Sequence, residues 1–261
     1  AHLPESERFE HFAAYITIQR HYSETFDSGD VVTEPGADTG IDAMALLVNG
    51  ALVTDIQALE EQATRVGNLD VTFVFVQAER SAAFDGAKIG TFGAGVLDLF
   101  SDAPSLPRND DVAEFAAMAD ALYKRNASKF RRGNPVCQLY YVTTGKWVGD
   151  PTLETRRRLA VNALSDTGLF RKVNLQPIDA AGVQHLYMQT KNAIVRDFTF
   201  ADKTVVPDVP GVAAAYLGFL PAPEFLKLIQ DDGGEIISGL FYDNVRDWLD
   251  STPVNDEIRL T

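Results

Sequence analysis

The feature of this sequence that most constrains its fold is the run from Val71 to Arg80, which reads VTFVFVQAER. A continuous run of β-branched and aromatic residues is typical of a strand that other elements cover on both faces. Strand side chains alternate between the two faces, so Gln77 and Glu79 would share one face at the polar end. The run therefore predicts a buried strand that ends in polar residues.

A second apolar strand is expected earlier in the chain, over residues 41–48, with Asp42 near its start. If the two strands pair, Asp42, Gln77 and Glu79 converge at one edge of the sheet. Oxygen ligands gathered in this way suit a hard divalent cation. The alternative is that Asp42 and Glu79 are ordinary polar strand ends that face water. Spacing alone does not decide between these two interpretations.

The charge of the chain bears on its partners. With 37 acidic residues against 23 Lys and Arg, the formal net charge is −14, which argues against loose electrostatic binding to nucleic acid. The stretch from Lys124 to Lys172 is nevertheless locally positive and could meet a phosphate backbone. The alternative is that residues 156–158 form the solvated face of a helix. The candidate nucleic-acid-binding residues are Lys124, Arg125, Arg131, Arg132, Arg156 and Arg157.

Membrane, secreted and disulfide-rich classes are all disfavoured. No stretch approaches the roughly 20 apolar residues that a membrane span needs. The N-terminal residues lack the basic start and apolar stretch of a signal peptide. The single cysteine, Cys137, excludes an internal disulfide framework and a cysteine zinc cluster, and its apolar neighbours predict a core position. We therefore expect a cytoplasmic protein without a membrane partner.

Predicted strands and helices alternate along the chain, which indicates an α/β sandwich. Asn49-Gly50 predicts a tight hairpin turn, and Asp150-Pro151 predicts a helix start. Thr54 and Gln57 fit a capping box that opens a helix. Helices are expected over residues 5–22, 54–66, 110–127, 150–166 and from 179, strands over 41–48, 51–53, 71–77, 136–144, 170–178 and 194–200, and a helical or loop segment over 84–100.

The composition changes around Pro207, Pro210 and Gly211, which is typical of a linker or domain boundary. A short strand over residues 212–220 and a short helix over 223–230 are expected beyond it. We therefore divide the chain into an α/β domain over residues 1–205 and the start of a second α/β domain over residues 206–261. The sequence stops as though an element were cut midway, so a longer protein is expected.

The order of elements resembles that of the PD-(D/E)xK nuclease superfamily, in which a leading helix with an acidic residue precedes a strand bearing Asp, a hairpin, and a strand ending in Gln-x-Lys. More closely, the chain resembles the N-terminal part of the abortive-infection phage-resistance (AIPR) family. The segment from Leu240 onward is the most specific match. The matching residues are Phe9-Glu10-His11-Phe12, Gly40-Ile41-Asp42-Ala43, Phe73-Val74-Phe75-Val76-Gln77-Ala78 with Ser81 and Phe84-Asp85, and Leu240-Phe241-Tyr242-Asp243-Asn244-Val245-Arg246-Asp247 with Val254-Asn255.

This resemblance implies a restriction-endonuclease-like mixed sheet flanked by helices and metal-dependent hydrolysis of DNA or RNA phosphodiester bonds in anti-phage defence. It further implies that Asp42, Gln77 and the backbone carbonyl of Ala78 hold Mg²⁺ or Mn²⁺. Glu10 corresponds to a helical acid that assists the metal, although it could equally face solvent. A bound cation would supply hydroxide near neutral pH and offset the charge that develops on the phosphate.

The sequence departs from the pattern at Glu79, where the superfamily has a lysine that orients the attacking water and stabilises the transition state. Three interpretations stay open. Glu79 could disable the enzyme, it could be a deliberate change that disarms a toxic nuclease, or it could act as a general base and additional metal ligand. Arg80 would point to the opposite face of a regular strand, and Lys88, in the next segment, is a weaker substitute still.

A competing hypothesis comes from another functional class. The chain could be a catalytically inactive nuclease-fold module that binds nucleic acid or a partner protein, and Glu79 is the residue that separates this hypothesis from an active enzyme. A homodimer formed through the acidic remainder of the surface is a further alternative.

Overall fold

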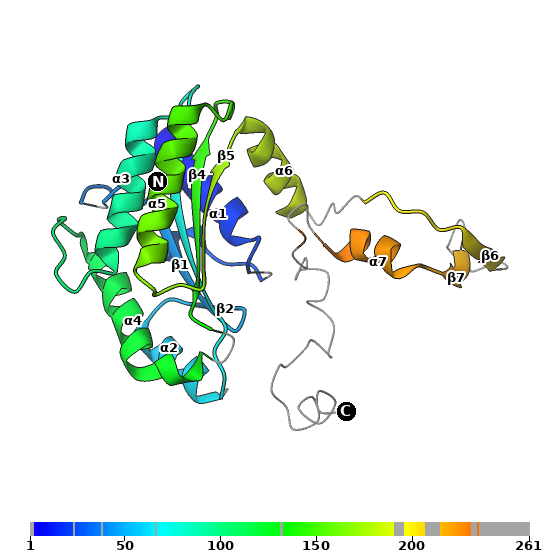
Figure 1. The fold of residues 1–261 in the computed structure, drawn as a ribbon, viewed down its shortest axis with the longest axis horizontal. Coiled ribbons are helices and arrows are strands. Elements are labelled where there is room, and N and C mark those ends of the chain that lie inside the picture. The colour runs from blue at the N-terminus through cyan, green and yellow to red at the C-terminus, as the bar shows by residue number, and fades with distance from the viewer. Residues whose placement is uncertain are drawn as a thin grey trace. The chain divides into compact units, whose positions relative to one another are not determined.

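The computed structural model describes residues 3–22, 24–37, 39–65, 67–130, 133–190, 196–206, 215–230 and 234. The chain divides into two compact units, residues 1–190 with 249–261 and residues 191–248. Figure 1 labels the elements of both units. The sequence placed the boundary after residue 205, a position inside strand β6 (Asp202–Val206). The Pro- and Gly-rich cue used for that boundary lies outside the described residues.

The first unit is built on a five-stranded mixed sheet in the order β2-β1-β3-β4-β5. β1 is antiparallel to β2 and to β3, whereas β3, β4 and β5 run parallel to one another. The expected mixed α/β sheet is therefore confirmed, and the two polar-ended strands, β1 and β3, are neighbours in it. The strands are β1 (Ala43–Val48), β2 (Ala51–Val53), β3 (Val71–Glu79), β4 (Val136–Thr143) and β5 (Lys172–Ile178).

Helices cover both faces of this sheet, as Figure 1 shows. Phe73 and Phe75 of β3 pack in a core beneath α2, α3, α4 and α5, whereas Val74 and Val76 pack in a second core beneath α1 and α6. Because successive side chains of β3 enter the two cores in turn, the central part of the strand is apolar on both faces. The helices are α1 (Glu5–Ile18), α2 (Ile56–Arg65), α3 (Gly86–Leu99), α4 (Asp110–Asn126), α5 (Pro151–Asp166) and α6 (Ala180–Thr190).

Local sequence signals account for several element ends. Asn49 and Gly50 have φ values of 52° and 79°, which are the left-handed values that a tight hairpin turn between twisted strands requires. The Asp150 carboxylate accepts hydrogen bonds from the backbone N–H groups of Thr152 and Leu153 at 2.8 and 3.1 Å, and Pro151 opens α5. Both predictions are confirmed.

Two predicted helix ends are wrong. The cap of α2 is Asp55, whose carboxylate accepts a hydrogen bond from the Ala58 N–H at 2.7 Å, so Thr54 precedes the cap. The helix α1 ends at Ile18, before the expected end at Tyr22. The Gln19 side chain donates to the Tyr22 carbonyl at 2.7 Å, and this bond stabilises a turn in place of further helix.

Glycine in α3 permits close packing against α5. A Cβ placed on Gly93 would lie 2.5 Å from the Ala160 Cβ, too near for any side chain. A Cβ on Gly95 would lie 2.1 Å from the backbone oxygen of Thr39. These two glycines hold α3 against α5 and against the loop that leads to Asp42.

The second unit contains an antiparallel pair, β6 and β7 (Ala215–Phe219), and helix α7 (Ala222–Ile229). The expected strand over residues 194–200 is wrong for its described part, since residues 196–200 form no regular element and the strand begins at Asp202. The segment from Leu240 onward that carries the most specific resemblance lies outside the described residues. Within the described parts of the chain, no helix is long and apolar enough to cross a membrane.

Candidate functional site

The start of β1 lies against the polar end of β3. Asp42 immediately precedes β1, and its backbone N–H donates to the Val76 carbonyl at 2.8 Å. The Asp42 Oδ2 atom accepts a hydrogen bond from the backbone N–H of Ala78 at 2.6 Å. Asp42 thus binds β3 on both sides of Gln77. Antiparallel pairing of β1 with β3 is what brings these residues together, because the start of one strand then meets the end of the other.

The Gln77 side chain presents an unsatisfied oxygen at this junction. Its Oε1 atom is buried and has no hydrogen-bond partner among the described residues. Its Nε2 atom lies close to Gly40, 3.8 Å from the position that a Cβ would take there. A buried acceptor without a donor costs about 1–3 kcal/mol, so such an atom calls for an explanation.

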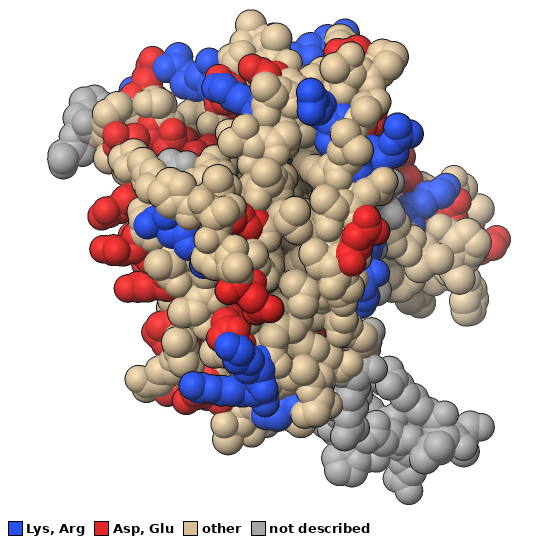
Figure 2. Space-filling view, turned by 60° about the vertical axis from the view of Figure 1, so that its left-hand side comes forward, with Lys and Arg blue, Asp and Glu red and all other residues tan. Residues whose placement is uncertain are grey.

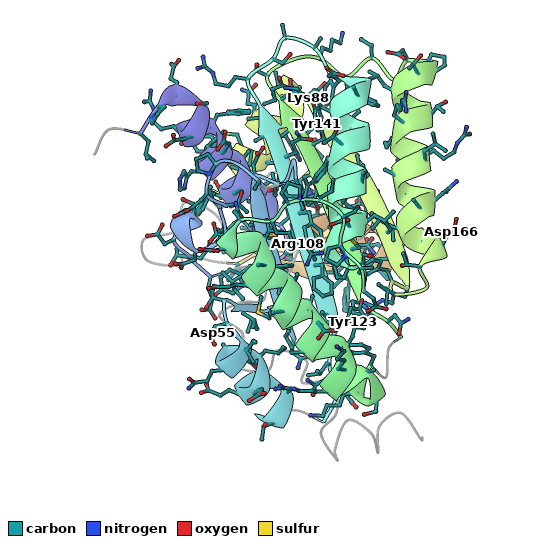
Figure 3. All side chains as sticks on the ribbon, turned by 90° about the vertical axis from the view of Figure 1, so that its left-hand side faces the viewer. Asp55, Lys88, Arg108, Tyr123, Tyr141 and Asp166 are labelled. Carbon is teal, nitrogen blue, oxygen red and sulfur yellow. The ribbon has the colours of Figure 1, made fainter. Side chains whose placement is uncertain are left out.

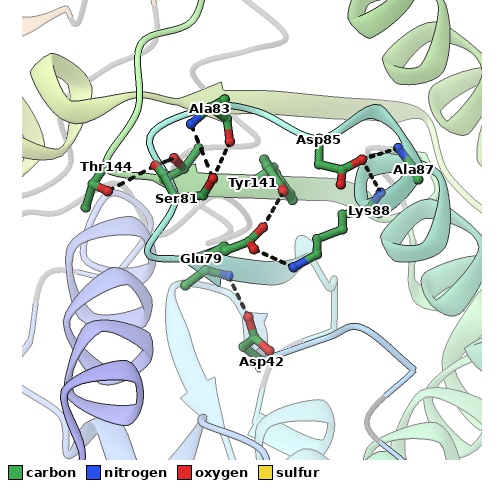
Figure 4. A network of polar contacts seen from close by, with 11 residues as sticks. Asp42, Glu79, Ser81, Ala83, Asp85, Ala87, Lys88, Tyr141 and Thr144 are labelled. Atoms are coloured by element: carbon green, nitrogen blue, oxygen red, sulfur yellow. Dashed lines mark hydrogen bonds and ion pairs between the residues drawn. The ribbon is translucent and has the colours of Figure 1, made fainter.

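Glu79 is engaged by two side chains from neighbouring elements, as Figure 4 shows. Its Oε1 atom forms an ion pair with the Lys88 ammonium group. Its Oε2 atom accepts a hydrogen bond from the Tyr141 hydroxyl at 3.1 Å. Burial raises the pKa of Tyr141, and the neighbouring Glu79 charge raises it further, so the hydroxyl stays protonated and donates. We call Glu79, Lys88 and Tyr141 the rim cluster.

The strands and the following loop position the rim cluster. Tyr141 lies beside Gln77 in the parallel register of β3 and β4. Lys88 stands in the first turn of α3, where the Asp85 carboxylate caps the helix by accepting from the Ala87 and Lys88 N–H groups at 2.7 and 3.4 Å. The start of α3 is therefore held beside the end of β3, near enough for the Lys88 side chain to reach Glu79 (Figure 4).

The loop between β3 and α3 is tied to the end of β4. The Thr143 and Thr144 hydroxyls both donate to the Ser81 carbonyl, at 2.7 and 3.0 Å. A Cβ on Gly145 would lie 2.5 Å from the Ala82 carbonyl oxygen, so the two backbones approach closely there. These contacts set where α3 begins, and hence where Lys88 lies.

Arg80 turns away from the rim cluster. Its guanidinium forms an ion pair with Glu5, at the start of α1, at 2.5 Å. Because α1 covers the face of the sheet opposite to Glu79, the predicted direction of Arg80 is confirmed. Glu10 lies further along the same helix and is half-buried. The structure thus places the helix of Glu10 beside the end of β3, but across the sheet from the rim cluster.

The candidate nucleic-acid-binding residues fall into separate groups. Lys124 and Arg125 lie in the last turn of α4, which precedes β4 in the chain, and they form ion pairs with Asp120 (2.9 Å) and Glu60. Arg156 and Arg157 follow the other end of β4, in α5. Figure 3 shows the two ends, with Lys88 and Tyr141 at one and Tyr123 at the other, and Figure 2 shows basic side chains gathered toward both ends of one face. Arg131 and Arg132 lie outside the described residues.

Arg156 and Arg157 differ in their surroundings. Arg157 is half-buried, and its guanidinium binds Glu154 at 2.8 Å and the Leu175 carbonyl at 3.4 Å. Arg156 is exposed, and its aliphatic chain lies against the start of α3, with its Cγ 3.4 Å from the position of a Cβ on Gly86. Of the two, Arg156 is the better placed to meet a ligand near Lys88.

The donor set at the end of β3 fits a hard cation in part. Asp42 and the unsatisfied Gln77 oxygen are ligands of the kind that Mg²⁺ and Mn²⁺ prefer. Glu79 does not fit as a ligand in this arrangement, since both of its oxygens already bind Lys88 and Tyr141. Within the described ranges, no group of three or more His, Cys, Asp or Glu side chains is placed to hold a metal ion.

Sequence reasoning missed Tyr141, which stands within an apolar run and carries no motif. It also ranked Lys88 low. A usable signal for Lys88 was present in Asp85, because an Asp cap at that position starts a helix and places Lys88 in its first turn, next to the strand end. Comparisons of the chain with protein-family models, with curated proteins and with solved structures return no match.

Proposed function

We propose that this chain is a metal-dependent nuclease that hydrolyses phosphodiester bonds of DNA or RNA in anti-phage defence. The proposal is carried by two observations at the junction of β1 and β3: the Asp42 carboxylate accepts a hydrogen bond from the Ala78 N–H, and the side-chain oxygen of Gln77, the residue before Ala78, is buried and unsatisfied. The succession of a leading helix, an Asp-bearing strand, a hairpin and a Gln-ended strand also supports it. This succession is what a restriction-endonuclease-like domain of the AIPR type would have.

In this proposal Asp42, the Gln77 amide oxygen and the Ala78 carbonyl would hold Mg²⁺ or Mn²⁺. Such a cation, when bound, lowers the pKa of water and offsets charge on the phosphate. The Ala78 N–H fixes one carboxylate oxygen of Asp42, so the carboxylate is oriented before any cation binds. Glu10 is given no part in holding the cation, because α1 covers the face of the sheet opposite to the rim cluster.

Hydrolysis forms a bond from the water oxygen to phosphorus as the bond from phosphorus to the leaving sugar oxygen breaks. The water loses one proton and the leaving oxygen gains one. Both Glu79 oxygens bind neighbouring side chains, Oε1 the Lys88 ammonium group and Oε2 the Tyr141 hydroxyl, so Glu79 is not assigned as the base. Solvent takes up the proton that the attacking water loses.

A carboxylate beside a phosphate is itself unfavourable. Two like unit charges about 4 Å apart repel by roughly 1 kcal/mol in water and roughly 4 kcal/mol near a protein surface. The ion pair with Lys88 offsets the Glu79 charge, so substrate can approach the rim. Arg156, exposed beside the start of α3, supplies a further cation for the nucleic-acid backbone.

The test compares the chain with Asp42→Asn, which preserves the size of the side chain. We expect Mn²⁺-dependent cleavage of plasmid or RNA by the unaltered chain, specific Mn²⁺ binding by calorimetry, and loss of both in the variant. Asp55→Asn is the matched control, because Asp55 is an exposed helix cap at the other end of the unit (Figure 3) and Asn caps helices equally well. An unaltered chain that binds no Mn²⁺ and cleaves neither substrate would refute the proposal.

The engagement of both Glu79 oxygens by Lys88 and Tyr141 favours a second candidate, an inactive nuclease-fold module that binds nucleic acid or a partner protein. This candidate predicts nucleic-acid or partner binding without cleavage, whether or not Mn²⁺ is present. The same assay therefore separates the two.

A further inference from the structure

We propose that Lys88 provides the positive charge on the scissile phosphate in this site, reaching it from α3, and that Glu79 and Tyr141 are positioning residues for its ammonium group. This inference rests on the proposed nuclease function and adds a catalytic residue to it. Phosphoryl transfer gains much of its rate from cations placed where negative charge develops, so a lysine held at the strand end has a defined chemical use.

The first support is the place of the ammonium group. The Lys88 Nζ atom forms an ion pair with Glu79 Oε1 at the end of β3, although the Lys88 backbone belongs to the next helix, α3. An ammonium group carries several N–H donors, so an ion pair with one carboxylate oxygen leaves capacity for phosphate oxygens. The Lys88 side chain is 48% exposed, so a substrate can reach it.

The second support is that several neighbouring elements fix the position of the Lys88 ammonium group. Asp85 caps the helix at the Lys88 N–H, and the preceding loop is bound to β4 through the Ser81 carbonyl. Tyr141, which is fully buried, holds the Glu79 oxygen that Lys88 does not use. Helix, strand and partner carboxylate therefore all restrict where the ammonium group lies.

The third support is the second cation nearby. The exposed Arg156 lies along Gly86, which precedes Lys88 by half a helical turn. The close contact of Gly93 with Ala160 keeps α5 against α3, so the two cations belong to one surface. A surface that presents Lys88 and Arg156 beside a neutralised carboxylate suits a polyanionic backbone.

The experiment measures kcat and KM for Mn²⁺-dependent cleavage of one oligonucleotide by four chains: the unaltered chain, Lys88→Gln, Lys227→Gln, and the double exchange Glu79→Lys with Lys88→Glu. Lys227 is the matched control, because it is an exposed lysine, 53% accessible, that is paired with Glu224 in the second unit. Thermal unfolding of each variant checks that it folds.

We expect Lys88→Gln to lower kcat by about 100-fold, with a smaller rise in KM because Glu79 is left unpaired and with Mn²⁺ affinity little changed, and Lys227→Gln to leave all three unchanged. The double exchange keeps the ion pair and returns the ammonium group to β3, so it should recover most of the lost kcat. An unchanged kcat in Lys88→Gln, a loss confined to KM, or no recovery in the double exchange would overturn the role of Lys88 while the nuclease stands. An unaltered chain without cleavage would overturn both proposals.

Discussion

The Asp42 carboxylate accepts a hydrogen bond from the backbone N–H of Ala78 at 2.6 Å, which joins the start of β1 to the end of β3 through a side chain. A residue that we propose as a metal ligand thus also joins two neighbouring strands of the sheet. Substitution of Asp42 should therefore lower the free energy of unfolding as well as the proposed activity. Comparing alanine with asparagine at this position separates the two effects.

Asp42→Ala should lower the free energy of unfolding by about 1–3 kcal/mol, because the Ala78 N–H loses its acceptor in a partly buried place. Asp42→Asn retains an acceptor oxygen and should cost less than the alanine variant. Urea unfolding at neutral pH measures both. Equal stability of the two variants would show that the carboxylate does not support the sheet.

Tyr141 should make the protein less stable at high pH. Its ordinary pKa is 10.0, and burial with the nearby Glu79 charge raises it in the folded state. Below the ordinary value both states keep the proton and this residue adds no pH dependence. As pH rises above 10.0, the unfolded chain loses the proton first, so the contribution to stability declines until the raised pKa is passed.

Tyr141→Phe tests this sign. The free energy of unfolding should fall less steeply above pH 10.0 in the variant than in the unaltered chain, while at neutral pH the variant should lose about 1 kcal/mol with its hydrogen bond to Glu79. Parallel pH profiles for the two chains would contradict the assigned environment.

The Cys137 thiol should be inert in the folded protein. It is fully buried, and burial raises its pKa, so neither access nor thiolate is available for reaction. A thiol reagent at mildly alkaline pH should label the chain in denaturant and leave the native chain unlabelled over the same time. Prompt labelling of the native protein would show that β4 opens readily.

Gly93→Ala should be destabilising in spite of the higher helix propensity of alanine. The added methyl group would lie 2.5 Å from the Ala160 Cβ, and such overpacking typically costs about 1–3 kcal/mol. Gly90→Ala in the same helix is the control, since its Cβ would meet nothing within 4 Å, and it should gain about 0.5–1 kcal/mol. Chemical unfolding of both variants measures the difference, and a gain in both would mean that α3 and α5 separate easily.

Features that depend on neighbouring residues could be predicted from the sequence. The continuous apolar run within Val71–Glu79 predicted a strand with two covered faces, and Asn49-Gly50 predicted a turn because few residues adopt its backbone angles. Asp150-Pro151 likewise marked the start of α5. Each of these signals acts within a few residues and needs no knowledge of the rest of the chain.

Features that depend on distant segments of the chain could not be predicted from the sequence. Lys88 and Glu79 meet because the loop between them is bound to β4, and no local pattern reports that contact. Thr and Asp can both cap a helix, so the sequence alone does not distinguish Thr54 from Asp55. Asp55 is the cap because α2 begins at Ile56. The positive stretch from Lys124 to Lys172 was predicted as one patch, but β4 runs between Lys124 and Arg125 on one side and Arg156 and Arg157 on the other, so the two pairs lie toward opposite ends of the sheet.

Two consecutive residues at the end of β3 bind helices in different layers: Glu79 holds Lys88 of α3, and Arg80 holds Glu5 of α1. Side chains of two consecutive residues thus contact helices on opposite faces of the sheet, so a displacement of the first turn of α1 and one of the first turn of α3 would both act on the same short backbone segment.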